Sequence, residues 1–355
     1  LLPYTSPSLS IISYFLCIIL SMCFFDKISS FGINYSLFFI IKKIERKDFK
    51  MAIKLFSHVD LDGVSPFILL NYYYPMDTIN YQFCNYNDIN KYVQNFLDSK
   101  EYLNYEAIYI TDISISEELA EKLEKITKET TITIRLFDHH ATALNLNKFD
   151  FCSVMTEKNN ELTCGTQLFY DYLTDELNFD KKDFISRYVK YVNDYDTWLW
   201  TTKYKYDLPD QWNTLFYFYG KQIFVENVLN KFKNNTTMFS DTDNLILTVE
   251  ANKKHLYIQN KIKDVFKKEI DGKDCVIVFA ESYTNDIATA LKIKYPNSDI
   301  QIIVGQKGIS YRCRDNTDID LCEFAKQFGG GGHPKAAGSS ISKEQREKMI
   351  KVLFE

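Results

Sequence analysis

The stretch Thr131–Ala143, TITIRLFDHHATA, decides the fold that we expect for this chain. Its first seven residues alternate β-branched and apolar side chains with no breaker, which predicts a buried strand. The strand ends abruptly in Asp138, His139 and His140. An acid and two imidazoles are costly to bury unless a partner, usually a metal ion, satisfies them. For this stretch alone, a loop whose histidines cap neighbouring backbone groups is the alternative.

Two other apolar runs end in the same way. Ile53–Ser57 is followed at once by HVDLDG at residues 58–63, and Ala107–Thr111 is followed by Asp112. Helical patterns separate the runs, so we expect an α/β fold with a parallel, doubly wound sheet. The carboxyl ends of the strands of such a sheet share one edge, where ligands bind. One such ending could be a helix cap, but three together predict a common site.

The remaining periodic segments predict a second, smaller α/β unit after a helical stretch. The expected helices are 64–74, 89–97, 117–126 (capped by Ser116), 164–173, 184–193, 284–294, 321–328 and one from Lys343; the other expected strands are 77–84, 275–280, 300–305 and 309–312. We therefore divide the 355 residues into an extension at 1–50, a first α/β domain at 51–200, a helical linker at 201–270 and a second α/β domain at 271–355.

The first fifty residues are treated separately because Met51 stands immediately before the first expected strand. Our hypothesis is that Met51 is the natural start and that residues 1–50 are an upstream region carried along in translation. A membrane anchor is the alternative. The apolar stretch Ile11–Phe25 is short for a membrane span and lacks the basic start of a signal peptide.

The composition is that of an ordinary globular protein, with 46% hydrophobic and 25% charged residues. A net charge of -5 argues against a histone-like basic protein and leaves room for a local basic site for a phosphorylated ligand. The eight cysteines form no C-x-x-C pair. This pattern argues against a zinc ribbon and favours a reduced, cytoplasmic protein.

The acids and imidazoles at the strand ends form one mixed set, joined by a carboxylate from the pair Asp194 and Asp196. Its other members are His58, Asp60, Asp62, Asp112 and His139. Carboxylates with imidazole and without thiolate suit Mn²⁺ first and Mg²⁺ second, rather than a structural zinc. The number of acids predicts two divalent cations, which clamp both oxygens of a phosphoryl displacement and lower the pKa of a bridging water.

Four motifs together resemble the DHH phosphoesterase superfamily with a C-terminal DHHA1 domain. They are HVDLDG at 58–63, ITD at 110–112, DHH at 138–140 and GGGGHPKAAG at 329–338, and the resemblance covers roughly Lys54 to Ser340. It implies one metal held by His58, Asp60 and Asp112, and a second held by Asp62, Asp112, His139 and a fourth-motif acid. We assign that acid to Asp194, because it directly follows the expected helix end; Asp196 is the competitor.

The resemblance also implies roles outside the metal ligands. His140 would face the substrate phosphate or leaving oxygen as a donor, and Asp138 would orient a neighbouring imidazole. The active site would lie in the cleft between the two domains, with a substrate grip supplied by Arg312, Gly330, Gly331, Gly332, His333 and Lys335. A glycine run lets backbone N–H groups approach an anion, although a flexible linker is the alternative. For Trp198, Trp200 and Trp212 we favour core packing over stacking on bases.

The function that these motifs imply is a metal-dependent phosphodiesterase of the nanoRNase branch, which trims very short oligonucleotides. We expect a short single-stranded oligonucleotide or a nucleotide as the partner and no stable duplex DNA. A membrane partner is expected only if residues 1–50 are native, and a homodimer stays open. The alternatives are hydrolysis of 3′-phosphoadenosine 5′-phosphate or a cyclic dinucleotide, and a non-catalytic nucleotide-binding protein.

Overall fold

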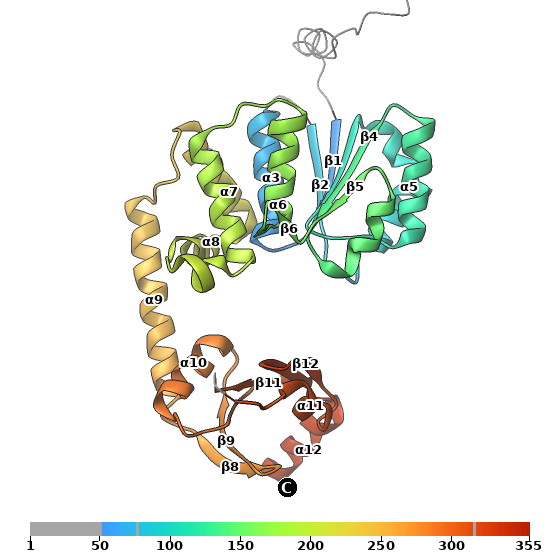
Figure 1. Ribbon diagram of the computed structural model, residues 1–355. Helices are drawn as coiled ribbons and strands as arrows, with labels where there is room; N and C mark the ends of the chain where they lie inside the picture. Colours follow the sequence, from blue (N-terminus) through green and yellow to red (C-terminus); the bar gives the residue numbers. More distant parts are fainter. Residues whose placement is uncertain (1–51, 76–77, 315–316) are drawn as a thin grey trace, which may run out of the picture.

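The computed structural model describes residues 52–75, 78–314 and 317–355. Two α/β domains lie at opposite ends of a long helix, α9 (Asp241–Lys261), as Figure 1 shows. The hypothesis on residues 1–50 and Met51 concerns residues outside this description. Within the described ranges, no helix has the length and apolar character that a membrane crossing requires.

The N-terminal domain is built on a sheet of five parallel strands in the order β2-β1-β3-β4-β5. The strands are β1 (Ala52–Ser57), β2 (Thr78–Phe83), β3 (Ala107–Thr111), β4 (Thr133–Asp138) and β5 (Cys152–Val154). The parallel sheet expected from the alternating pattern is confirmed. All five residues of β3 are buried, as in a parallel strand with both faces covered.

Helices cover both faces of this sheet (Figure 1). One face carries α3 (Leu61–Tyr73), α6 (Gly165–Asp171), α7 (Asp183–Asp196) and α8 (Leu208–Lys233). The other carries α4 (Ile89–Asp98), α5 (Glu117–Glu129) and a 3-10 helix (Ala141–Lys148). Leu55 packs into the first core and Phe56 into the second, because neighbouring strand residues point to opposite faces.

Helix α8 belongs to the core of the N-terminal domain, although we expected it in the linker at 201–270. Trp212, Phe224 and Phe232 lie in the same buried cluster as Leu55 of β1. The segment that connects the two sheets is therefore largely α9. The domain bounds at 200 and 270 stay a prediction.

The C-terminal domain holds a six-stranded sheet in the order β12-β13-β11-β10-β9-β8. Its strands are β8 (Phe266–Ile270), β9 (Lys273–Phe279), β10 (Ile300–Val304), β11 (Gly308–Cys313), β12 (Gly331–His333) and β13 (Ala336–Ser340). β9 and β10 pair in parallel, and the other neighbours pair antiparallel. The helices are α10 (Thr284–Lys294), α11 (Leu321–Lys326) and α12 (Lys343–Phe354). Strands β8, β12 and β13 were not expected from the sequence.

Short elements complete the description. In the N-terminal domain they are a 3-10 helix (Glu101–Asn104), a hairpin of β6 (Glu157–Lys158) and β7 (Glu161–Leu162), and π-helical turns at Tyr172–Glu176 and Trp200–Tyr204. Of these, the turn at Trp200–Tyr204 follows α7 and so lies next to the acids of the fourth motif.

Candidate active site

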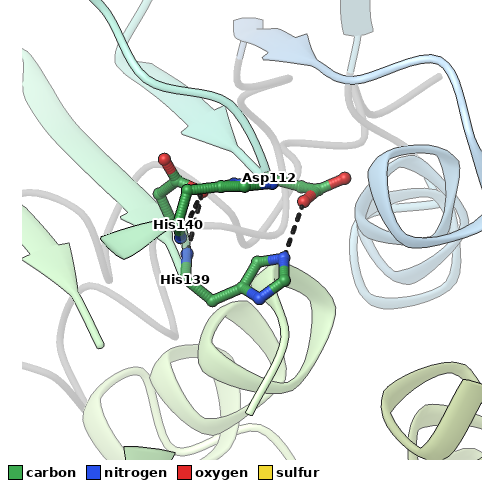
Figure 2. A group of neighbouring side chains, drawn as sticks. Asp112, His139 and His140 are labelled. Atoms are coloured by element: carbon green, nitrogen blue, oxygen red, sulfur yellow. Dashed lines mark hydrogen bonds and ion pairs between the residues drawn. The ribbon is translucent and has the colours of Figure 1, made fainter. Parts of the chain in front are cut away.

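Three neighbouring strands deliver the central side chains of the site. His58 follows β1, Asp112 follows β3 and His139 follows β4. Nε2 of His139 lies 3.3 Å from Oδ1 of Asp112 (Figure 2), and Nδ1 of His58 lies 3.6 Å from Oδ2 of Asp112. The expected meeting of these three groups at one sheet edge is confirmed. Their role as metal ligands stays a prediction.

Asp112 lies at the centre of the cluster in an uncommon conformation. Its φ of 56° is in the left-handed region, its side chain is buried, and its Oδ2 accepts no hydrogen bond. Burial, followed by the nearby carboxylates Asp62, Asp60 and Asp196, raises the pKa of Asp112 well above its ordinary value. A buried carboxylate oxygen without a donor is costly, so it indicates room for a cation at this point.

Gly165 allows Asp112 to occupy this position. A Cβ atom added to Gly165 would lie 2.7 Å from Cβ of Asp112, which is closer than real Cβ atoms approach. The same glycine begins α6 and donates its N–H to Oδ2 of Asp62 at 2.8 Å, while the N–H of Thr166 donates to Oδ1 at 2.8 Å. These two bonds to the start of a helix orient Asp62, whose Oδ2 lies 3.9 Å from Nε2 of His139.

The first motif is shaped by the start of α3. Asp60 caps this helix by accepting from the N–H of Gly63 at 2.9 Å, and its other oxygen lies 2.8 Å from Nδ1 of His58. Burial alone would raise the pKa of Asp60, but the hydrogen bonds from His58 and Gly63 lower it on balance. A Cβ atom on Gly63 would lie 2.3 Å from the carbonyl oxygen of His58. Glycine is therefore required here for the chain to turn from strand to helix.

The acid of the fourth-motif pair that lies next to His139 is Asp196 and not Asp194, contrary to the position that we expected; its role as a metal ligand stays a prediction. Oδ2 of Asp196 lies 3.2 Å from Nε2 of His139. Asp194 is buried elsewhere, where it accepts from Nζ of Lys190 at 2.8 Å and from the hydroxyl of Tyr206. The error followed from ending the helix at residue 193, whereas α7 continues to Asp196. Both acids are thus helical, and only one faces the cluster.

The two histidine side chains of the DHH triplet point in different directions. His139 turns to Asp112, whereas Nδ1 of His140 lies 2.7 Å from Oδ1 of the buried Asp138. This contact agrees with the expected orienting role of Asp138, and it raises the pKa of His140 above its ordinary value. The Nε2 atom of His140 lies 2.9 Å from the hydroxyl of Tyr86.

Tyr86 is a site residue that the sequence motifs did not indicate. Its ring lies 4.7 Å from the ring of His58, and half of the residue is exposed. It follows β2, the neighbour of β1 in the sheet. That position was the available signal, because the end of β2 lies at the same sheet edge as the ends of β1, β3 and β4.

The residues present fit divalent cations. Three groups each bring ligand atoms within 4.8 Å of one another: His58, Asp60 and Asp112; Asp62, His139 and Asp196; and Asp112, Asp138, His139 and His140. The raised pKa of Asp196, caused by burial and then by Asp62 and Asp60, shows the same crowding of carboxylates as at Asp112. Cations held by oxygen and imidazole would offset this repulsion.

The expected substrate grip lies in the C-terminal domain. Arg312 on β11 donates to Oδ1 of Asn285 at 2.7 Å, and Lys335 donates to the carbonyl of Thr317, so these bonds stay within that domain. His333 on β12 is exposed. The participation of these residues in a cleft between the two domains stays a prediction.

The second half of the glycine run, Gly331 and Gly332, lies in strand β12, so the flexible linker that was the alternative is not what the structure has here. A Cβ atom on Gly330 would lie 2.1 Å from the carbonyl oxygen of Gly338, and one on Gly332 would lie 2.7 Å from that of Ala336. These glycines therefore permit close packing against β13. Gly331 has open space around its Cβ position. Anion binding by the run stays a prediction.

The tryptophans differ in their surroundings. Trp212 is buried against Tyr188 and Phe224, which confirms core packing. Core packing is wrong for Trp198, which is 50% exposed with its ring parallel to that of Trp200.

Comparisons with known proteins show which family the chain resembles. The family model described as the DHHA1 domain matches residues 264–355. The chain is 30% identical over 305 residues to oligoribonuclease NrnB of Bacillus subtilis, a match that spans 84% of this chain and 75% of that protein. It is 22% identical over 307 residues to the uncharacterized protein R106 of Acanthamoeba polyphaga mimivirus, covering 79% and 65% of the two chains.

A solved structure supports the fold independently. Exonuclease RecJ bound to manganese aligns with a TM-score of 0.51 and 10% identity, covering 92% of this chain and 94% of that chain. Taken with the strand-end carboxylates and imidazoles, these matches define the class. The chain belongs to the DHH phosphoesterase superfamily, in its nanoRNase-like branch with a C-terminal DHHA1 domain, and is a hydrolase acting on phosphoester bonds.

Proposed function

We propose that the protein hydrolyses the phosphodiester bonds of short single-stranded oligonucleotides, with two divalent cations at the sheet edge. The observation that carries the proposal is the meeting of His58, Asp112 and His139, with Oδ2 of Asp112 left without a donor. The substrate class is supported by the 30% identity to a protein named oligoribonuclease.

The ligand sets that we propose share Asp112 as the bridge. One consists of His58, Asp60 and Asp112, and the other of Asp62, Asp112, His139 and Asp196. Bound Mn²⁺ or Mg²⁺ would supply an activated water and charge stabilisation for the phosphoryl group. The carboxylate and imidazole ligands favour Mn²⁺ over a structural zinc.

We propose that His140 acts on the substrate rather than on a cation. Its Nδ1 contacts the Asp138 carboxylate, so the imidazole is held in one orientation and its pKa is raised. A protonated His140 can donate from Nε2 to a phosphate or leaving oxygen once the Tyr86 hydroxyl gives up that contact. In the C-terminal domain, the Arg312 guanidinium is the cation best suited to a second phosphate of the substrate.

A substrate panel with metal titration tests the proposal. RNAs of two to five residues, a cyclic dinucleotide and 3′-phosphoadenosine 5′-phosphate are incubated with Mn²⁺ or Mg²⁺, and products are separated chromatographically. We expect mononucleotides from the short RNAs, with His139→Ala lowering kcat/KM by about 100-fold or more because it removes a ligand of the cluster.

The matched control is His255→Ala, since His255 is an exposed histidine on α9 far along the chain from the cluster motifs. It should retain full activity. Turnover of the bisphosphate or cyclic dinucleotide with intact short RNA would contradict the proposed substrate class while preserving the phosphoesterase assignment.

A further inference from the structure

A polar pocket adjoins the candidate active site on the side of His140. Its volume is about 290 Å³, and Asp138, His140 and Tyr86 form the wall that it shares with the site. The opposite wall comes from the start of α5 and from the 3-10 helix after the DHH triplet. Its polar residues are Ser116, Glu117, Thr142 and Asn145. Nothing in the proposed ligand sets or in the substrate grip uses this pocket.

Tyr86 contacts both the cluster and the pocket. Its ring lies 4.7 Å from His58, its hydroxyl lies 2.9 Å from Nε2 of His140, and 52% of the residue is exposed. A group bound in the pocket would therefore meet an aromatic face next to His140, the residue that we propose contacts the phosphate. Exposed aromatic rings of this kind stack on nucleobases with little regard to sequence.

The charges around the pocket decide which part of a nucleotide it suits. The carboxylates of Glu117 and Asp138 both line it, but each is already paired. Glu117 contacts Nζ of Lys148 at 2.7 Å, and Asp138 contacts Nδ1 of His140 at 2.7 Å. With these charges paired, the residues that line the pocket offer a second phosphate no unpaired cation, whereas ribose hydroxyls can hydrogen-bond to its polar walls. The pocket thus suits an uncharged nucleoside, whose base would lie against Tyr86.

We propose that this pocket binds the terminal nucleoside of the oligonucleotide, next to the scissile phosphate, with its base on the Tyr86 ring. The assignment rests on the proposed function and adds to it. Because the pocket offers another phosphate no unpaired cation, a chain that continued through the pocket would be disfavoured. Hydrolysis is thereby confined to the last phosphodiester bond of the chain.

The test crosses a protein change with a substrate change. Wild type and Tyr86→Leu are assayed with Mn²⁺ on a three-residue RNA and on versions in which the 5′ or the 3′ terminal base is absent. For one of the two ends, we expect loss of the base to lower kcat/KM of the wild type about tenfold, mainly through KM. Tyr86→Leu should lower kcat/KM on the intact RNA by a similar factor. Removing the base from the RNA should then lower kcat/KM of this variant little further.

Control variants separate stacking from other effects. Tyr86→Phe keeps the ring and should keep the sensitivity to the missing base, whereas Tyr92→Leu, an exposed tyrosine on α4, should behave as wild type. Calorimetric titration should give Tyr86→Leu and wild type the same Mn²⁺ affinity. A variant that loses Mn²⁺ binding as well would contradict the proposal, because the ring would then support the cluster.

The remaining outcomes distinguish this proposal from the proposed function. The first outcome is an enzyme that cleaves short RNA but in which Tyr86→Leu and the missing base lower kcat/KM by independent factors at both ends of the RNA. This result would overturn the pocket assignment alone. A wild type that cleaves no short RNA would overturn the proposed function and the pocket assignment with it.

Discussion

Asp194 and Asp196 lie two residues apart on the last turn of α7, and the helix sends them in different directions. Each residue of an α-helix turns the side chain by about 100°, so the pair is separated by roughly 200°. Asp196 reaches His139, while Asp194 is buried against Lys190 and Tyr206. Of these two aspartates, Asp196 therefore belongs to the candidate site and Asp194 supports the fold.

This difference predicts opposite phenotypes for two matched substitutions. Asp196→Asn should lower kcat/KM and Mn²⁺ affinity by about 100-fold, because it removes a charge from the cluster, with little change in the unfolding transition. Asp194→Asn should lower the free energy of unfolding by about 1–3 kcal/mol, since it leaves Lys190 without its carboxylate. Kinetics, calorimetry and urea unfolding of both variants provide the measurement. Loss of metal affinity in Asp194→Asn with normal affinity in Asp196→Asn would restore the assignment made from the sequence.

At the level of elements, the junction of α8 and α9 holds the start of the connecting helix to the N-terminal domain. Asp243 is buried in the first turn of α9 and accepts from Nζ of Lys231 at 2.6 Å and from the hydroxyl of Tyr219 at 2.8 Å. It also completes a capping box with Ser240. Burial acts to raise the pKa of Asp243, but these hydrogen bonds lower it on balance.

The lowered pKa predicts how the junction responds to acid. A carboxyl group with a depressed folded pKa contributes stability above its unfolded pKa of about 3.9 and loses that contribution as the pH falls through the folded value. Asp243→Asn should therefore lower the free energy of unfolding by about 2–3 kcal/mol at pH 7. The difference from wild type should shrink as the pH approaches 3. Asp241→Asn, on the exposed side of the same turn, should lower the free energy of unfolding much less at pH 7.

A constant difference between wild type and Asp243→Asn across this pH range, measured by urea unfolding, would contradict a contribution from charge. It would indicate that packing of the capping box, rather than the charge of Asp243, holds the junction.

The elements themselves followed the sequence closely wherever the periodicity was strong. The strand at Ala107–Thr111 and the helix at Thr284–Lys294 have the expected bounds. Helix α7 was underestimated because polar residues at its last turn resemble a helix end. Strands β12 and β13 were missed because glycine-rich segments carry no alternating pattern, and only close contact between their backbones makes them pair.

For the molecule as a whole, the crowded carboxylates that form the candidate site also lower the stability of the fold. Asp112 and Asp196 both have a raised pKa, caused first by burial and then by other acids of the cluster. Groups whose folded pKa is raised destabilise the fold as the pH rises above their unfolded pKa. The reason is that ionising such a group costs more in the folded protein than in the unfolded chain. Divalent cations would remove this penalty.

We therefore expect the thermal stability of the protein to depend on metal. Saturating Mn²⁺ should raise the Tm relative to EDTA, corresponding to about 2.7 kcal/mol at 100 times the Kd. In EDTA at pH 7, Asp112→Asn should be at least as stable as wild type, because asparagine carries no charge and tolerates the left-handed backbone at this position. In Mn²⁺ the order should reverse and activity should be lost. Scanning calorimetry of both proteins with and without metal gives the result; an Asp112→Asn protein less stable than wild type in EDTA would contradict this expectation.

The sequence by itself determined the alternation of strands and helices from β1 to β4 and the acids and imidazoles that follow β1, β3 and β4. It could do so because alternating and helical patterns are local, and because parallel strands place their carboxyl ends at one edge. Only the tertiary structure decided that Asp196 and not Asp194 joins His139, that Tyr86 contacts His58 and His140, and that Gly165 makes room for Asp112. These outcomes depend on the direction of a side chain and on the distance between segments far apart in the chain, and no local pattern encodes either.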